Sequence, residues 1–179
     1  MRYHTILIDP PWNERGAGKC RRGADRHYKL LTFAEIYELL IDELVNKEQI
    51  GNPCHLYLWV TNNHLKEGLE ILEALDFRYI TNLVWAKDSF GLGQYFRGQH
   101  ELCLFGVFGK TQLTLQRNLS TLITAKKREH SQKPLKMYDL IERASLPPRL
   151  EMFAREKRQG WDVWGIEAPS GTQSLLDSK

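Results

Sequence analysis

The feature that most constrains the fold is a regular alternation of strand-like and helix-like segments. Short runs rich in apolar and β-branched residues predict strands at residues 3–9, 54–60, 77–86, 101–108, 150–154 and 161–164, with a weaker strand signal near residues 120–125. Apolar residues recur at helical spacing after Thr32, after Asn62 or Asn63, and after Pro134. Strands that alternate with helices form α/β folds with helices on both faces of the sheet. We therefore predict a mixed, mostly parallel sheet that binds ligands at the carboxyl ends of its strands.

The predicted helices have start signals and apolar faces. Thr32 and Glu35 have the spacing of a capping box, and Pro134 is suited to the first turn of a helix. Apolar spacing then predicts three inward faces: Phe33, Ile36, Leu39, Leu40 and Leu44 in the first helix, Leu65, Leu69, Leu72 and Leu75 in the second, and Leu135, Met137, Tyr138 and Ile141 in the third.

The length of 179 residues suits one domain with a substantial core and is too short for two ordinary domains. We predict a single domain over residues 1–167 and a flexible polar tail over residues 168–179. No apolar run reaches the length that spans a membrane, and the first residues enter a strand directly instead of forming a signal peptide. We therefore expect the protein in the cytoplasm.

Three cysteines, Cys20, Cys54 and Cys103, stand far apart in the sequence. Their spacing indicates neither a zinc ribbon nor a disulfide framework. The segment Pro53-Cys54-His55 also lacks the second cysteine that a zinc-dependent base deaminase requires. We expect reduced thiols in or near the core and no bound metal.

Positive charge is concentrated in two segments, although the net charge of the whole chain is only +3. Residues 13–29 contain Arg15, Arg21 and Arg22 among other basic residues, with few acidic ones. A second basic cluster begins at Lys126-Lys127-Arg128. Basic loops on a nearly neutral body are suited to contact with phosphate groups, and they are also typical of solvated loops. Charge alone leaves both interpretations open.

The segment with the most specific chemistry is Asp9-Pro10-Pro11-Trp12, at the end of the first predicted strand. An adenine amino group is a poor nucleophile because its lone pair is delocalised into the ring. Acceptors for both of its hydrogens favour a tetrahedral nitrogen, and the Asp9 carboxylate and the Pro10 carbonyl can supply them. Consecutive prolines hold that carbonyl in place. Trp12 offers a flat face on which an extruded base can stack. The alternative is a proline-rich turn in which Trp12 only packs.

On these and other residues the chain resembles the MT-A70 family of N6-adenine methyltransferases, which includes the eukaryotic mRNA adenosine methyltransferases and many small bacterial and phage enzymes. The resemblance extends from about Ile6 to Glu167. Besides the Asp-Pro-Pro-Trp tetrapeptide, it is carried by Tyr28, Leu58-Trp59-Val60-Thr61, Val84-Trp85-Ala86-Lys87, Arg97-Gly98-Gln99-His100-Glu101, His130-Ser131-Gln132-Lys133-Pro134 and Gly160-Trp161-Asp162-Val163-Trp164-Gly165.

The resemblance implies a Rossmann-like methyltransferase fold with a permuted order of motifs, and S-adenosylmethionine as cofactor. It implies that Asp9, Pro10, Pro11 and Trp12 are the catalytic residues. It places cofactor binding at Ile8, Asp9, His100, Glu101, Ser131, Lys133, Arg155, Gly165, Ile166 and Glu167. It places substrate binding at Trp12, Asn13, Arg15, Arg21, Arg22, Tyr28 and Lys87.

Two positions depart from the family pattern. Ile166 stands where many relatives have an asparagine that can bond the cofactor ribose. His100 stands where the eukaryotic enzymes have a lysine for the cofactor carboxylate. Lys87 is suited either to a nucleic-acid contact or to capping the end of its strand, while Trp59 and Trp85 are expected in the core.

The implied reaction is a direct methyl transfer to N6 of adenine in a nucleic acid, with DNA favoured over RNA and without a metal. We expect a monomer or homodimer that does not associate with membranes. One alternative is a catalytically silent, nucleic-acid-binding partner subunit of the same fold, although the intact Asp-Pro-Pro-Trp segment argues against it. Another is methylation of protein glutamine, against which Trp12 and the basic loop favour a nucleic-acid base.

Overall fold

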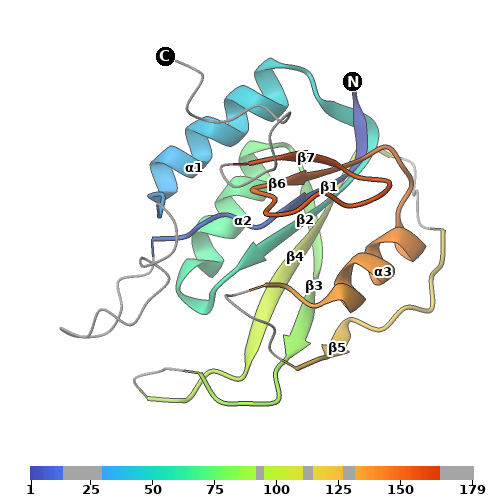
Figure 1. Cartoon of the computed structure of the whole chain (residues 1–179). Coiled ribbons are helices and arrows are strands. Elements are labelled where there is room, and N and C mark those ends of the chain that lie inside the picture. Colours follow the sequence, from blue (N-terminus) through green and yellow to red (C-terminus); the bar gives the residue numbers. More distant parts are fainter. Residues whose placement is uncertain (14–29, 92–94, 111–114, 127–131, 166–179) are drawn as a thin grey trace.

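The computed structural model describes residues 1–13, 30–91, 95–110, 115–126 and 132–165. In these residues seven strands form one sheet in the order β5-β3-β4-β2-β1-β6-β7 (Figure 1). β4 is antiparallel to both of its neighbours, and every other neighbouring pair is parallel. The strands are β1 (Tyr3–Ile8), β2 (Ile50–Val60), β3 (Arg78–Ala86), β4 (His100–Phe108), β5 (Leu122–Thr124), β6 (Arg149–Met152) and β7 (Asp162–Trp164). The predicted mixed, mostly parallel sheet is confirmed, and the weak strand signal corresponds to β5.

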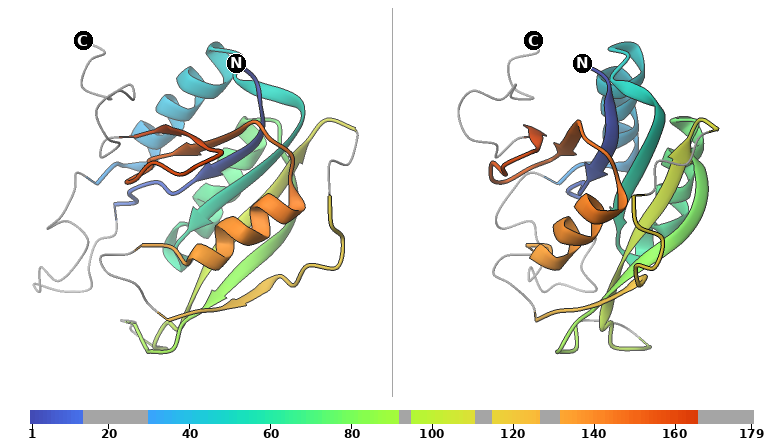
Figure 2. Two further views of the ribbon diagram at one scale, coloured as in Figure 1. Left: turned by 45° about the vertical axis from the view of Figure 1, so that its right-hand side comes forward. Right: turned by 90° about the vertical axis from the view of Figure 1, so that its right-hand side faces the viewer.

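Helices cover both faces of this sheet, as the sequence predicts. The helices are α1 (Phe33–Leu40), which continues into the π-helix η2 (Ile41–Asn46), the short 3-10 helix η3 (Asn62–His64), α2 (Leu65–Ala74) and α3 (Leu135–Ala144). α1 and α2 cover one face and α3 covers the other (Figure 2). None of the helices in the described residues is long and apolar enough to cross a membrane.

Successive side chains of a strand point to opposite faces of the sheet, so the strands contribute to two hydrophobic cores, one on each face. On the central strand β1, Ile6 and Ile8 point to the face covered by α1 and α2, whereas Leu7 points to the face covered by α3. On β2, Leu58 follows the first pattern and Trp59 the second. The predicted burial of Trp59 and Trp85 is confirmed, because both belong to the core on the α3 face. The central strands are therefore buried on both faces, as expected for parallel strands.

The predicted start of α1 is confirmed. The Thr32 hydroxyl accepts a hydrogen bond from the Glu35 backbone N–H, and the Glu35 carboxylate accepts one from the Thr32 backbone N–H. Neither Asn62 nor Asn63 caps α2, which begins only after the 3-10 turn. These asparagines were predicted as caps because the turn that precedes α2 is not visible in the sequence pattern.

Two residues assigned to inward helix faces were predicted wrongly. Leu69 is 38% exposed, because Gly68 occupies the inner face of α2. A Cβ atom at Gly68 would lie 2.4 Å from Val60 Cγ1, so α2 approaches β2 more closely than a side chain allows. Leu135 is 50% exposed, since Met137 and Ile141 form the buried stripe of α3.

Candidate active site

The strand order gathers several chain segments at one edge of the sheet. Because β1, β2, β3, β5, β6 and β7 run in the same direction, their carboxyl ends lie at this edge, and the start of the antiparallel β4 lies there too. Asp9 follows the central strand β1, Lys87 follows β3, and Glu101 is paired with Trp85 at the start of β4. Residues far apart in the sequence therefore meet beside Asp9, at the edge where α/β sheets bind ligands.

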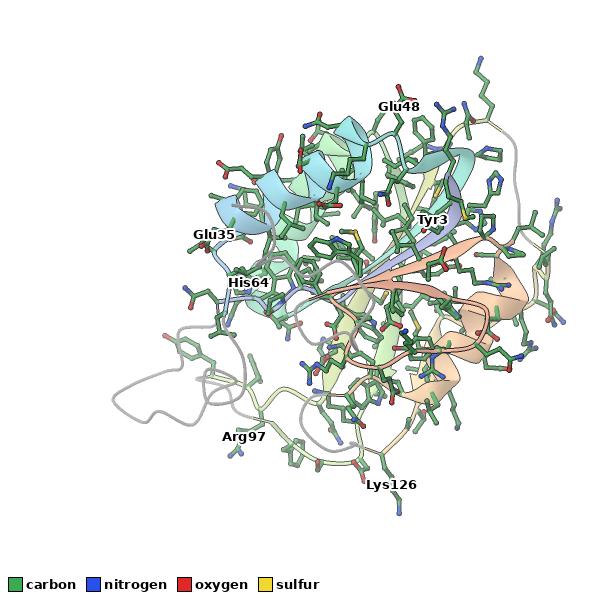
Figure 3. The ribbon with its side chains drawn as sticks, turned by 45° about the horizontal axis from the view of Figure 1, so that its top comes forward. Tyr3, Glu35, Glu48, His64, Arg97 and Lys126 are labelled. Carbon is green, nitrogen blue, oxygen red and sulfur yellow. The ribbon has the colours of Figure 1, made fainter. Side chains whose placement is uncertain are left out.

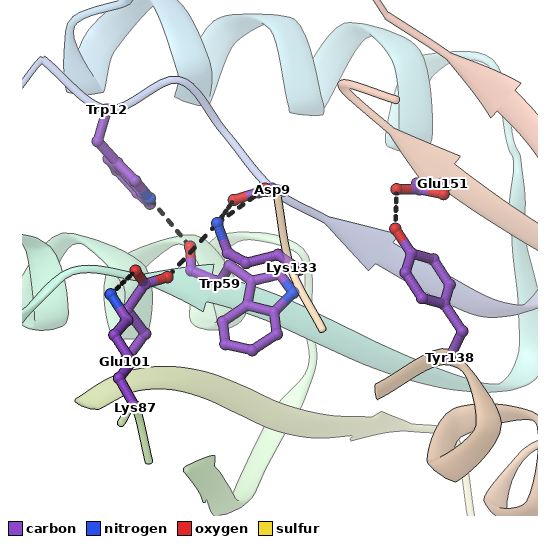
Figure 4. Close-up of polar contacts among 8 residues, drawn as sticks. All are labelled: Asp9, Trp12, Trp59, Lys87, Glu101, Lys133, Tyr138 and Glu151. Carbon is purple, nitrogen blue, oxygen red and sulfur yellow. Dashed lines mark hydrogen bonds and ion pairs between the residues drawn. The ribbon is translucent and has the colours of Figure 1, made fainter. Parts of the chain in front are cut away.

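The centre of this edge is an ion pair between Asp9 and Lys133 (Figure 4). Lys133 Nζ lies 2.7 Å from Asp9 Oδ1 and 2.9 Å from Oδ2, so one ammonium donates to both carboxylate oxygens. Lys133 precedes α3, and 124 residues separate it from Asp9. The structure thus brings the catalytic segment predicted at residues 9–12 together with the cofactor-side motif that contains Lys133.

Two further charges extend the ion pair into a network of alternating sign. Glu101 Oε2 lies 3.5 Å from Lys133 Nζ, and the other oxygen of Glu101 accepts a hydrogen bond from Lys87 Nζ. Burial by itself would lower the pKa of Lys133, but the carboxylates of Asp9 and Glu101 outweigh it and raise that pKa. Burial would raise the pKa of Glu101, but Lys133 and Lys87 lower it. Lys133 and Glu101 are therefore charged in the folded protein.

Two tryptophans lie beneath the network. Lys133 Nζ is 5.2 Å from the centre of the Trp59 ring, and Lys87 Nζ is 4.9 Å from the centre of the Trp85 ring. The two indoles pack edge to face, with ring centres 6.4 Å apart. Aromatic faces attract cations, so the two indole rings help to hold both ammonium groups at the strand ends. The sequence predicts burial for these residues but does not reveal that they support the site.

Trp12 is fixed to the same edge from the other face of the sheet. It is 5% exposed, and its Nε1 donates a 2.9 Å hydrogen bond to the Trp59 carbonyl (Figure 4). One face of its indole stacks on the His64 ring, with centres 4.9 Å apart and planes 20° apart. Trp12 therefore helps to form the core and positions the residues around Asp9. Stacking of a substrate base on Trp12 stays a prediction.

The backbone of the tetrapeptide is held by several hydrogen bonds. The Pro10 carbonyl accepts from Trp12 N–H at 2.9 Å, and the Pro11 carbonyl accepts from Leu31 N–H at 2.9 Å. Asn13 N–H in turn donates to the Leu31 carbonyl at 3.1 Å. A carbonyl oxygen has two lone pairs, so Pro10 keeps one for another donor. Asn13 and Leu31, which are 18 positions apart in the sequence, are thereby held next to each other.

The strands β6 and β7 complete the edge. Phe153 directly follows β6 with a positive φ of 62°, a conformation that is uncommon outside glycine and that turns the chain toward Ala154 and Arg155. A Cβ atom at Gly165 would lie 2.7 Å from Ala154 N, so glycine is required there for the two segments to approach. Arg155 lies close enough to Lys133 to oppose, by repulsion, the rise in its pKa.

One carboxyl at this edge was missed from the sequence. Glu151 lies in the middle of β6, is buried, and accepts a 2.7 Å hydrogen bond from the Tyr138 hydroxyl (Figure 4). Burial raises the pKa of Glu151 to about 7. Arg158 stacks over the Tyr138 ring, 3.7 Å from its centre. A single acidic residue within the predicted and otherwise apolar strand at residues 150–154 was the signal that could have identified it.

The other predicted site residues have different outcomes. Ile8 is fully buried, so any contact with a cofactor would involve its backbone. His100 is exposed at the start of β4, and Lys133 is the cation beside Asp9. Lys87 forms an ion pair with Glu101 at the strand end, and its contact with a nucleic acid stays a prediction. Seven predicted residues lie outside the described part of the chain: Arg15, Arg21, Arg22, Tyr28, Ser131, Ile166 and Glu167.

Within the described ranges, no group of three or more His, Cys, Asp or Glu side chains is arranged to hold a metal ion. The charged groups of the edge instead form a pattern suited to an amino acid. Lys133 and Arg155 can receive a carboxylate, and Asp9 can receive an ammonium group. S-Adenosylmethionine carries both groups on its methionine portion, so the residues present fit this cofactor.

Comparison with known proteins agrees with the motifs and the fold. The sequence model of the MT-A70 family matches residues 3–167. The type II methyltransferase M.MunI of a Mycoplasma species is 27% identical, over 98% of this chain and 84% of its own length. A probable N(6)-adenosine-methyltransferase of Oryza sativa is 30% identical over 89% of this chain, and the human catalytic subunit METTL3 is 28% identical over 86%. This chain spans only 22% and 26% of those two proteins. The chain belongs to the MT-A70 family of methyltransferases.

Proposed function

We propose that this protein transfers the methyl group of S-adenosylmethionine to the N6 amino group of adenine in a nucleic acid, with DNA preferred over RNA. The observation that carries the proposal is the position of Asp9. It ends the central strand within the Asp-Pro-Pro-Trp segment, and Lys133 holds its carboxylate at the edge of the sheet. The preference for DNA rests on the similarity to the type II methyltransferase M.MunI, which extends over 98% of this chain, compared with 89% and 86% for the two N(6)-adenosine-methyltransferases.

Asp9 and Pro10 supply the acceptors that the amino group needs. The Asp9 carboxylate accepts from one N–H of adenine, and the free lone pair of the Pro10 carbonyl accepts from the other. The cyclic side chains of Pro10 and Pro11 restrict the backbone, and the hydrogen bonds to Trp12 and Leu31 hold it further. A fixed acceptor pair needs little reorganisation as the nitrogen becomes tetrahedral, which lowers the barrier.

Lys133 and Asp9 also serve the cofactor. Bound S-adenosylmethionine supplies an electrophilic methyl group on a positively charged sulfur. The Lys133 ammonium would bind the carboxylate of the methionine portion, and Glu101 would keep Lys133 in place through its ion pair. Asp9 and the Pro10 carbonyl would hold N6 in line with the methyl group, and N6 would lose one proton to solvent once it carries that group. Holding nitrogen and methyl group in line accounts for much of the rate gain.

The test is incubation of the protein with isotopically labelled S-adenosylmethionine and either DNA or RNA, followed by mass spectrometry of the nucleosides. We expect labelled N6-methyladenine, with more label in DNA. Label on another base or on protein glutamine would contradict the proposal. Binding of nucleic acid without any transfer would identify the chain as a silent partner subunit, and a cofactor titration would support that result independently.

A further inference from the structure

The loop between β3 and β4 is described at residues 87–91 and 95–99, and both of its ends lie at the edge that holds Asp9. Its first residue, Lys87, is paired with Glu101, and this ion pair continues through Lys133 to Asp9. The base of the loop is closed by hydrogen bonds from Lys87 N–H to the Gln99 carbonyl and from Gly91 N–H to the Gly98 carbonyl. Arg97 Nε donates to the Gly91 carbonyl at 2.7 Å. The ends of the loop are therefore fixed relative to the active site.

This loop carries an unusual set of exposed aromatic side chains. Tyr95 is 94% exposed, Phe96 is 90% exposed and Phe90 is 66% exposed. The other aromatic residues with high exposure in the described part of the chain, Tyr37 and Tyr79, are 38% and 43% exposed. Single exposed apolar residues are ordinary, but three aromatic rings within seven residues cost solvation energy that a bound partner would recover.

Basic side chains lie at the same end of the molecule. Arg97 is exposed next to Phe96, and Lys126 is exposed two residues beyond the end of β5, which pairs in parallel with β3. Figure 3 shows Arg97 and Lys126 at the same rim. Lys136 adds a third positive charge, because its Nζ donates to the Thr124 carbonyl at the end of β5. Aromatic rings next to cations match the chemistry of a nucleic-acid strand, whose bases stack and whose phosphates are anionic.

We propose that the β3–β4 loop is a platform for single-stranded nucleotides that flank the target adenine, with their bases stacked on Tyr95 and Phe96 and their phosphates near Arg97 and Lys126. A duplex presents base edges and phosphates but hides the base faces, so exposed rings favour a single strand. The inference rests on the proposed function, because it assigns this strand to the same site. Stacking contacts are tolerant of base identity, so the platform contributes affinity and not sequence choice.

The platform is tested with an oligothymidylate and an oligouridylate, neither of which contains the target base. The affinity of the full chain for each is measured by fluorescence anisotropy. In the double variant Tyr95→Leu/Phe96→Leu we expect affinity to fall by about tenfold for each stacked ring lost. The variant Tyr95→Phe should bind like the wild type, since it keeps the ring. The matched control is Tyr79→Leu, at the opposite end of β3, which should also bind like the wild type.

Each outcome decides the inference. Unchanged affinity of the double variant for both probes overturns it, and so does equal loss in the Tyr79→Leu control. If the double variant instead converts a wild-type dimer into a monomer, with probe affinity unchanged, the loop is an interface between two copies. Because neither probe contains adenine, these results are independent of whether adenine methylation is observed.

Discussion

Two polar clusters are built into the same sheet, one at its carboxyl edge and one away from that edge, and they differ in charge. At the carboxyl edge, Asp9, Lys133, Glu101 and Lys87 form a network of ion pairs. In the middle of β2, His55 and Tyr57 form a buried hydrogen-bond network with the Ser145 hydroxyl, and no carboxylate takes part in it. The Ser145 hydroxyl lies 2.7 Å from both His55 Nδ1 and the Tyr57 hydroxyl.

The difference separates chemistry from structure. Burial lowers the pKa of His55 to about 4 and raises the pKa of Tyr57, so both are neutral near pH 7. A neutral, satisfied network stabilises the packing of α3 on the sheet and offers no group to a ligand. The charged network can exchange one internal ion pair for a ligand's carboxylate and ammonium groups. The contact between His55 and Ser145 is therefore structural, whereas the contact between Asp9 and Lys133 belongs to the active site.

The largest expected effect follows from removing Asp9. In Asp9→Ala, kcat/KM should fall by about a hundredfold or more, because a fixed acceptor for the developing charge is lost. Asp9→Asn should also be poor, since its amide brings a donor toward the adenine hydrogens. Steady-state methylation assays measure this, with circular dichroism to check folding. Near-wild-type turnover in Asp9→Ala would show that the charged network is not the site of the reaction.

The next effect concerns pH. The folded pKa of His55, about 4, is below its usual value of 6.5, so its contribution to stability is complete above pH 6.5 and is lost as the pH falls to about 4. The loss should be about 3 kcal/mol, since one pKa unit corresponds to about 1.4 kcal/mol. Glu151 has the opposite effect on stability: its pKa is raised to about 7, so its contribution to the free energy of unfolding is lost as the pH rises.

A variant isolates the histidine. The difference in free energy of unfolding between wild type and His55→Gln, measured by urea titration from pH 7 to pH 4, cancels the Glu151 effect. This difference should shrink as the pH falls. A difference that does not change with pH would mean that His55 is protonated within the core or is reached by water.

Ser145→Ala tests the neutral cluster directly. It removes the hydroxyl that His55 and Tyr57 share, and should lower the free energy of unfolding by about 1–3 kcal/mol. The kcat of the folded fraction should not change, because Ser145 follows the last residue of α3, whereas Lys133 of the charged network precedes the first. Loss of kcat without loss of stability would show that the neutral cluster takes part in the reaction.

The sequence predicts part of the site around Asp9. The Asp-Pro-Pro-Trp segment and the motif around Lys133 are both recognisable, but their ion pair joins residues 124 positions apart and depends on the order of the strands. His100 was predicted in the cofactor site from its position in a motif; it is exposed at the start of β4, and its contact with a cofactor stays a prediction. Local patterns therefore identify the participants, and the sheet decides which of them meet.

The packing between neighbouring elements was less visible for a related reason. A glycine in the middle of α2 moved the buried face from Leu69 to Gly68, because close helix–strand packing outweighed apolar spacing. Glu151 could be read as one polar residue in an apolar strand, but its raised pKa requires the burial that β6 and Tyr138 provide. Periodicity predicts that an element has an inner face, and it does not predict how closely the next layer approaches.

The smallest expected effect is that of Trp12→Phe, and comparison with Trp12→Ala decides whether Trp12 acts only in packing or also binds the substrate base. Trp12→Phe keeps an aromatic ring that can stack on His64 but loses the hydrogen bond from Nε1 to the Trp59 carbonyl. The free energy of unfolding should fall by about 1 kcal/mol, the usual net value of one hydrogen bond. Trp12→Ala should cost about 3–5 kcal/mol, because it also opens a cavity. If Trp12 also stacks on the substrate base, the KM for an adenine-containing oligonucleotide should rise more in the Ala variant than in the Phe variant at a temperature where both are folded. Equal KM values in both variants would show that Trp12 acts only through packing, and the stacking surface for nucleotides would then lie elsewhere at this edge.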